Sequence, residues 1–330
     1  MGYNAGSSGR RRVDVTAEEA VAKIADVVAN IEMVVKGKTE AVRLAIVTLL
    51  ARGHLLIEDV PGVGKTVLAH SLAQSLNCSF RRIQFTSDLL PSDILGVSIF
   101  NQSSHEFEFR RGPIFSNIVL ADEINRATPK TQSSLLEAMS EGQVSVENET
   151  LALPAPFMVV ATQNPIEYYG TYPLPESQLD RFHMRIHLGY PEREFERMIV
   201  TGMRSSEKLA AMTPVLNGDE VASLQERVER VRMESSLQEY LLEIVERTRA
   251  SDRFQLGVSP RGAIALYRCA QAMAVVEGRD YCVPDDIKRL AAACFAHRVI
   301  LTSRRRDGGW STAETAEAVA ELIESVSVPR

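Results

Sequence analysis

The stretch His54–Gln74, HLLIEDVPGVGKTVLAHSLAQ, decides the fold of this chain. Its first apolar residues predict a short buried strand, and the residues from Lys65 onward place valines and leucines at helical spacing. A Pro-Gly-Val-Gly loop joins the two segments. A strand, a glycine-rich loop and a helix in this order surround the phosphates of a nucleotide with backbone N–H groups. The stretch therefore predicts a nucleotide-binding site.

The residues of this loop have distinct predicted roles. The Lys65 ammonium is expected on the β- and γ-phosphates, and the Thr66 hydroxyl on Mg²⁺. Asp59 replaces the first glycine of the usual pattern, which affects the entry of the loop but leaves the Pro-Gly turn in place. The alternative is a chance Gly-Lys-Thr in an ordinary turn, and the strand–loop–helix context argues against it. The residues predicted to bind the nucleotide are Pro61, Gly62, Val63, Gly64, Lys65, Thr66 and Val67.

Two carboxylates end the second predicted buried strand, which begins at Asn117. Ligands of an open α/β sheet bind at the carboxyl ends of its strands, and a buried unpaired carboxylate is costly. A neighbouring magnesium–phosphate group would explain both acids. We predict that Asp122 holds the water shell of the metal and that Glu123 polarises the water that attacks the γ-phosphate. The alternative is a pair of N-cap residues for the following helix.

Asn164 ends the third predicted strand, which begins at Phe157. Its amide could orient the attacking water or contact the γ-phosphate. An Asn-Pro pair after a strand is also typical of a simple turn, so both interpretations stand.

Composition and charge set broad limits on the function. The chain has 330 residues, enough for two domains, and a net charge of −6, which argues against a protein that mainly grips a nucleic-acid backbone. No apolar run approaches the roughly 18 residues of a membrane span. The four cysteines are scattered and match no zinc-ligand spacing, so we expect reduced thiols in a cytoplasmic protein.

The order of predicted strands and helices divides the chain into three parts. Residues 1–15 predict a flexible leader, residues 16–190 an α/β nucleotide-binding core, and residues 191–330 a helical lid domain with a C-terminal tail. In the last part, Ser259 is the predicted N-cap of a long helix with proline at its first position. Arg261 follows in the first turn, where free N–H groups favour an anion.

These motifs together resemble the AAA+ ATPases, and more narrowly the MoxR family. The resemblance covers about Val34 to Val299 and is carried by four motifs in this order. It implies an α/β fold with a five-stranded parallel sheet, a helical lid and two inserted β-hairpins, which Ile99–Phe109 and Gln143–Leu153 fit. It also implies a homo-oligomeric ring, usually hexameric, with the nucleotide between subunits. The four motifs are Gly64-Lys65-Thr66, Ile118 to Ala127, Ala161 to Pro165 and Leu174 to Phe182.

The resemblance assigns a role to each matching residue. Lys65 and Thr66 match Walker A, Asp122 and Glu123 match Walker B, Asn164 matches sensor 1 and Arg261 matches sensor 2. Arg181 matches the arginine that reaches the γ-phosphate of a neighbouring subunit, and Arg126 is a second candidate for contact across the interface. The alternative for Arg181 is an ion pair with Asp180 or Glu176, and the alternative for Arg261 is a surface arginine.

The implied function is Mg²⁺-dependent hydrolysis of ATP to ADP by a chaperone-like factor that remodels or matures a protein client. The resemblance also implies a partner with a von Willebrand A domain. Three other interpretations remain open. One is a nucleic-acid motor related to the minichromosome-maintenance helicases, which the few basic residues in the predicted hairpins disfavour. Another is a nucleotide-gated binding scaffold with little turnover. The third is remodelling of the magnesium-chelatase type.

Overall fold

The computed structural model describes residues 16–146, 149–165, 170–201, 205–302 and 312–329 of the chain. The predicted leader, residues 1–15, lies outside the described residues, as does the tip of the second predicted hairpin, residues 147–148.

A five-stranded parallel sheet forms the centre of the molecule, with the strand order β2-β5-β8-β1-β9. Every residue of β5 is buried, as is expected of a parallel strand covered on both faces. This sheet confirms the predicted fold class. The five strands are β1 (Leu55–Glu58), β2 (Phe80–Gln84), β5 (Ile118–Asp122), β8 (Met158–Gln163) and β9 (Met184–Ile186).

Helices cover both faces of the sheet because alternate strand residues point to opposite sides. Leu120 and Val160 pack toward α1, α2 and α3, whereas Val119 and Val159 pack toward α4 and α5. Thr16 is the N-cap of α1 and forms a capping box with Glu19. These helices are α1 (Ala17–Glu32), α2 (Thr39–Leu50), α3 (Lys65–Ser75), α4 (Pro91–Leu95) and α5 (Pro129–Glu141).

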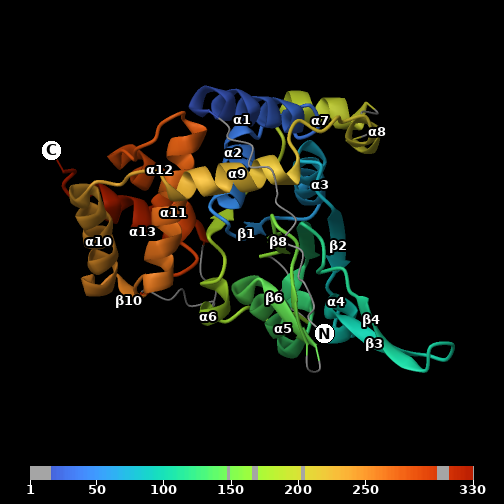
Figure 1. Cartoon of the computed structure of the whole chain (residues 1–330). Helices are drawn as coiled ribbons and strands as arrows, with labels where there is room; N and C mark the ends of the chain where they lie inside the picture. Colours follow the sequence, from blue (N-terminus) through green and yellow to red (C-terminus); the bar gives the residue numbers. More distant parts are fainter. Residues whose placement is uncertain (1–15, 147–148, 166–169, 202–204, 303–311, 330) are drawn as a thin grey trace, which may run out of the picture.

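Two antiparallel hairpins interrupt the core where the sequence predicts them. The hairpin of β3 (Gly96–Asn101) and β4 (Glu106–Arg111) projects from the body (Figure 1). The hairpin of β6 (Gln143–Val146) and β7 (Glu149–Ala152) follows α5. Two short elements complete the core: the 3-10 helix η1 (Ile124–Arg126) and α6 (Glu176–Leu179).

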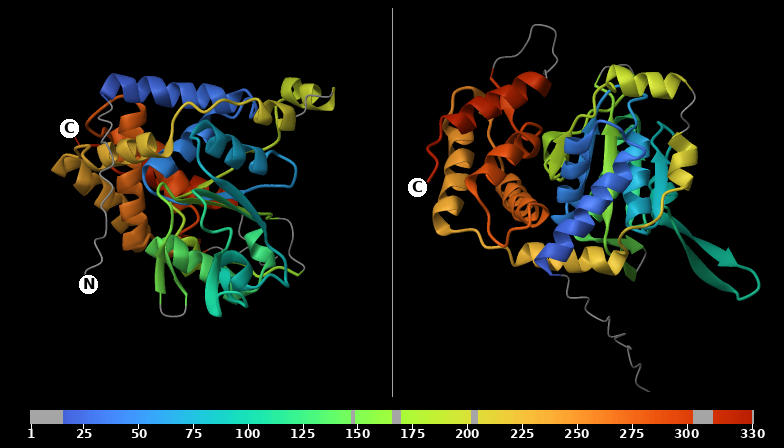
Figure 2. Two further views of the ribbon diagram at one scale, coloured as in Figure 1. Left: turned by 45° about the vertical axis from the view of Figure 1, so that its right-hand side comes forward. Right: turned by 90° about the horizontal axis from the view of Figure 1, so that it is seen from above.

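The second half of the chain is mainly helical and lies beside the sheet (Figure 2). Its apolar residues continue the cluster that begins at the sheet and passes through α1 and α2. In the described part of the chain, no helix is long and apolar enough to cross a membrane. The elements are α7 (Arg193–Val200), α8 (Ser205–Ala210), α9 (Gly218–Glu229), α10 (Ser235–Ala250), β10 (Phe254–Leu256), α11 (Pro260–Val276), α12 (Pro284–Phe295), β11 (Ile300–Leu301) and α13 (Thr312–Glu324).

Candidate nucleotide site

The glycine loop, the two strand-end carboxylates and Asn164 come together at the carboxyl edge of the sheet. Strand β8 lies between β1 and β5, with Glu58 opposite Gln163 and Ala121 opposite Ala161. The glycine loop, the two acids after Ala121 and Asn164 therefore follow three adjacent strands. Asn164 is buried at this edge. The structure thus brings together residues that are about 100 positions apart in the sequence.

The glycine loop has the conformation and the open space that a phosphate group needs. Gly62 and Gly64 have φ values of 84° and 98°, which favour glycine. A Cβ atom added at either position would meet no other atom within 4 Å. Gly64 is the N-cap of α3, and no side chain caps the N–H groups there. These features fit the phosphates of a nucleotide at the start of a helix.

Lys65 is held at the base of this loop. Its Nζ atom donates to the carbonyl of Asp59 at 2.6 Å and to the carbonyl of Gln163 at 3.4 Å. The side chain is buried, so backbone oxygens solvate its charge in place of water. An anion in the loop would offer the ammonium a stronger, charged acceptor.

Asp59 fixes the entry of the loop, where the usual pattern has glycine. Its Oδ2 atom accepts from the backbone N–H of Leu188 at 2.7 Å and of Gly189 at 2.6 Å. Its Oδ1 atom accepts from the N–H of Val60 at 2.9 Å. The carboxylate therefore ties the loop to the chain that follows β9. Sequence reasoning noted Asp59 as a departure but missed this contact, because its partners are backbone groups 129 and 130 residues away.

Asp122 is buried and already has partners in this structure. Arg82 of β2 donates to Asp122 Oδ2 through Nη2 at 2.6 Å and through Nε at 3.0 Å. The hydroxyl of Thr162 donates to Oδ1 at 2.6 Å. Carboxylate and hydroxyl oxygens are the ligands that Mg²⁺ prefers, so Asp122 and Thr66 fit a magnesium site. Arg82 and Thr162 were not predicted from the sequence.

Glu123 is held in an unusual backbone conformation with φ 57° and ψ 50°. Its N–H donates to the hydroxyl of Thr162 at 2.9 Å. Its Oε2 atom accepts from Nε2 of Gln84 and pairs with Nε of Arg126, both at 2.9 Å. A strained backbone at the end of a buried strand is typical of functional sites. Arg126, the second candidate for contact across an interface, here pairs within its own chain.

In the part of the chain that the structure describes, no hydrogen bond or ion pair joins Arg181 or Arg261 to the glycine loop. Arg181 Nη1 donates to the carbonyl of Leu136 at 2.5 Å and to the hydroxyl of Ser140 at 2.7 Å. Among the described residues it forms neither of the two ion pairs that we considered as alternatives. Arg261 is exposed in the first turn of α11, and the predicted N-cap Ser259 accepts from the N–H of Gly262 at 3.0 Å. Their roles at the γ-phosphate stay predictions.

His54 is buried just before β1, at the amino ends of the strands and so opposite the candidate site. Burial lowers the pKa of His54 to about 4, and its ring accepts from the N–H of Val159 and contacts the carbonyl of Met139. Across the described ranges, no group of three or more histidine, cysteine, aspartate or glutamate side chains could hold a metal ion. A magnesium ion here would depend on Thr66, Asp122, water and the phosphates.

Comparison with known proteins agrees with this geometry. Residues 54–184 match the ATPase family associated with various cellular activities (AAA), and residues 246–322 match the AAA lid domain. A crystal structure of a candidate ATPase from Cytophaga hutchinsonii superposes with a TM-score of 0.84 at 38% sequence identity. The match covers 95% of this chain and 97% of that chain. The fold is therefore that of an AAA+ protein.

Two relatives narrow the family. YeaC of Bacillus subtilis is 50% identical over 92% of this chain and 93% of its own length. Chaperone MoxR1 of Mycobacterium tuberculosis is 39% identical over 83% of this chain and 74% of its own length. The chain belongs to the MoxR family of AAA+ ATPases.

Proposed function

We propose that this protein hydrolyses ATP to ADP and phosphate in a Mg²⁺-dependent reaction. The observation that carries the proposal is the placement of an open glycine loop, a buried lysine and two strand-end carboxylates at one edge of the sheet. ATP is the substrate, and Mg²⁺, when bound, neutralises charge on the phosphates.

Each residue of the site has its own role in the hydrolysis of ATP. Lys65 and the N–H groups of the loop bind the phosphates, and Thr66 and Asp122 hold the metal. Glu123 orients the attacking water after it exchanges its contacts with Gln84 and Arg126 for that water. Asn164 contacts the water or the γ-phosphate from the adjacent strand.

We further propose that the active form is a homo-oligomeric ring, a hexamer. Arg181 then reaches the nucleotide of a neighbouring subunit, while Arg261 contacts the nucleotide of its own subunit. An arginine supplied in this way contributes about 10³–10⁵ in rate, so an isolated subunit is a poor ATPase. Residues 16–190 form the nucleotide-binding core and residues 191–330 the lid domain and tail, with residues 1–15 as a leader.

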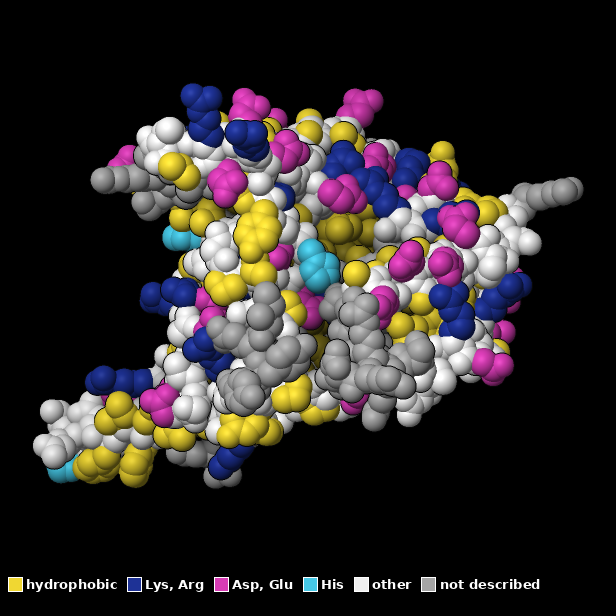
Figure 3. Space-filling view, turned by 180° about the vertical axis from the view of Figure 1, so that it is seen from behind, with side chains coloured by type: hydrophobic (Ala, Val, Ile, Leu, Met, Phe, Trp, Pro, Cys, Tyr) yellow, Lys and Arg dark blue, Asp and Glu magenta, His cyan; other side chains and the backbone are white. Residues whose placement is uncertain are grey.

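The work of the ATPase cycle is chaperone-like remodelling of a protein client in the cytoplasm, with a von Willebrand A domain protein as partner. A relative named as a chaperone supports the general role. All four cysteines, which lie in described segments, have free thiols. Hydrophobic side chains gather on the surface of the projecting β3–β4 hairpin (Figure 3). Among them, Phe107 is 70% exposed and Phe100 is 47% exposed. Such a surface suits an apolar polypeptide better than the phosphates of a nucleic acid.

The test is the ATPase rate per subunit as a function of protein concentration, combined with sizing in ADP and in a slowly hydrolysed ATP analogue. We expect the rate per subunit to rise with concentration as nucleotide-dependent oligomers form. A concentration-independent rate from a monomer would contradict the trans role of Arg181. No hydrolysis by assembled rings with Mg²⁺ would contradict the proposed activity itself.

A further inference from the structure

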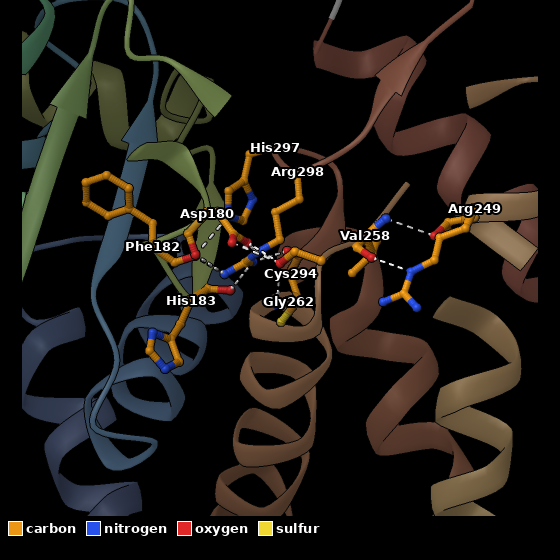
Figure 4. A network of polar contacts seen from close by, with 11 residues as sticks. Asp180, Phe182, His183, Arg249, Val258, Gly262, Cys294, His297 and Arg298 are labelled. Carbon is orange, nitrogen blue, oxygen red and sulfur yellow. Dashed lines mark hydrogen bonds and ion pairs between the residues drawn. The ribbon is translucent and has the colours of Figure 1, made fainter. Parts of the chain in front are cut away.

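A buried arginine of the lid joins the two arginines that the proposed function places on different nucleotides. Arg298, just after α12, has a side chain that is only 1% exposed (Figure 4). Its partner Asp180 immediately precedes Arg181. The two side chains form an ion pair, with Arg298 Nε 2.8 Å from Asp180 Oδ1.

Every N–H group of the Arg298 guanidinium has an acceptor. Beyond the carboxylate, Nη2 donates to the carbonyls of Asp180 at 3.0 Å and Phe182 at 2.5 Å, and Nη1 donates to the carbonyl of His183 at 3.1 Å and to that of Cys294. An arginine side chain has five N–H groups in a rigid fork. Four of those of Arg298 donate to Asp180, Phe182 and His183, the residues around Arg181. These hydrogen bonds tie the end of α12 to the segment around Arg181.

The same carboxylate holds the start of the helix that carries Arg261. The hydroxyl of Ser259 lies 2.8 Å and 2.9 Å from the two carboxylate oxygens of Asp180, to which it donates. It also accepts from the N–H of Gly262 as the N-cap of α11. A Cβ atom on Gly262 would lie 2.8 Å from Cδ of Arg298, so the glycine leaves room for the arginine to pass.

Arg261 lies two residues after Ser259, in the first turn of α11. Burial, with the neighbouring charges of His54, Arg298 and Arg261, lowers the pKa of His183 to about 3.

Arg181 itself is held much less completely than Arg298. In the described part of the chain, only its Nη1 atom donates, to Leu136 and Ser140 of α5. Its Nε is buried and has no hydrogen-bond partner among the described residues. A buried donor without an acceptor is costly, so this position of the guanidinium is readily exchanged for one with better acceptors, such as a phosphate. The backbone on either side of Arg181 is bonded to Arg298 of the lid, whereas the Arg181 side chain is held by Nη1 alone among the described contacts.

We propose that Asp180 and Arg298 are positioning residues that couple Arg261 to Arg181 within one subunit. This inference rests on the proposed function. When Arg261 engages the nucleotide of its own subunit, the start of α11 shifts, and Ser259, Asp180 and Arg298 carry that shift to Arg181. ATP in one site then controls the arginine that completes the neighbouring site.

The experiment mixes two full-length subunit types that are each inactive alone. An Arg181→Ala acceptor keeps its own site but supplies no trans arginine, and a Glu123→Gln donor supplies Arg181 but cannot hydrolyse. The mixture should hydrolyse ATP. Arg298→Lys is then added to either the donor subunit or the acceptor subunit. Lysine keeps the positive charge but has only three N–H groups for hydrogen bonds, where arginine has five. We expect at least about a fivefold loss of rate when the donor carries it and a smaller loss when the acceptor does.

Three controls make each outcome decisive. Arg253→Lys, at a lid arginine 55% exposed and paired with Glu321, should leave the rate unchanged in either subunit. Asp180→Asn in the donor subunit weakens the same ion pair from the other side, with Arg298 unchanged, and should also lower the rate. Thermal melts and sizing confirm that each variant folds and assembles.

The coupling would be overturned if Arg298→Lys lowered the ATPase rate equally in the donor subunit and in the acceptor subunit. It would also be overturned if neither Arg298→Lys nor Asp180→Asn in the donor subunit lowered the rate. Either result would show that the network only holds the lid in place. Failure of the unmodified pair to complement, with active wild-type rings, would overturn the trans role of Arg181 and the coupling together. Inactive wild-type rings would overturn the proposed hydrolysis.

Discussion

Arg82 Nη2 lies 2.6 Å from Asp122 Oδ2, so the carboxylate predicted to hold the metal is paired with a cation of the same chain. The arginine side chain is 50% exposed and the aspartate side chain 11% exposed. The pair therefore lies at the rim of the site, where solvent weakens the attraction. Binding of Mg²⁺ has to compete with this contact.

We expect Arg82→Ala to lower the Mg²⁺ concentration that supports half-maximal ATP hydrolysis. A partly exposed pair contributes up to about 1 kcal/mol, which corresponds to a shift of roughly two- to fivefold. The measurement is a magnesium titration at saturating ATP. Arg81→Ala, at the preceding exposed residue of β2, is the control. A higher Mg²⁺ requirement in Arg82→Ala would mean that Arg82 supports the metal site instead of competing for it.

Glu123→Gln should keep ATP binding and lose turnover by about 10²–10⁴, because the amide is a poor base for the attacking water. Glutamine can still accept from Gln84, so the resting contact of residue 123 is largely preserved. Nucleotide affinity by fluorescence and steady-state hydrolysis measure the two properties separately. Normal turnover in this variant would remove Glu123 from its role.

Asp59→Gly restores the usual glycine of the loop but should destabilise this protein. The change leaves the N–H groups of Leu188 and Gly189 without their acceptor, at a cost of about 1–3 kcal/mol. Asp59→Asn keeps one side-chain carbonyl oxygen as an acceptor, so it should lose less stability than Asp59→Gly. Chemical denaturation of the three proteins without nucleotide gives the comparison. A stability of Asp59→Gly equal to that of the wild type would show that water replaces the carboxylate at this point.

The buried His54 should make the fold sensitive to acid. Its pKa is lowered from 6.5 to about 4 by burial, so the native state binds fewer protons than the unfolded chain between these values. Its contribution to stability is complete above pH 6.5 and is lost as the pH falls toward 4. His54→Gln, whose amide does not titrate, should show a shallower loss of unfolding free energy over pH 6.5–4. Identical pH profiles for the two proteins would contradict this assignment.

Much of the fold could be read from the sequence because its signals are local. The apolar run before the glycine loop, the proline after Ser259 and the alternation around the two hairpins each depend on neighbouring residues. Lys65, Asp122 and Asn164 could also be placed at one edge, because parallel strands share their carboxyl ends.

The sequence by itself determined the strand–loop–helix at His54–Gln74, which follows from periodicity and from the chemistry of the motif, and its resemblance to a known family implied the parallel sheet. The residues that bind the phosphates stay a prediction from the same motif. Only the tertiary structure decided the partners of the charged groups: Asp59 with the chain after β9, Asp122 with Arg82, and Asp180 with Arg298. Long side chains reach groups that folding brings near from 40 to 130 positions away, and no local pattern encodes that distance.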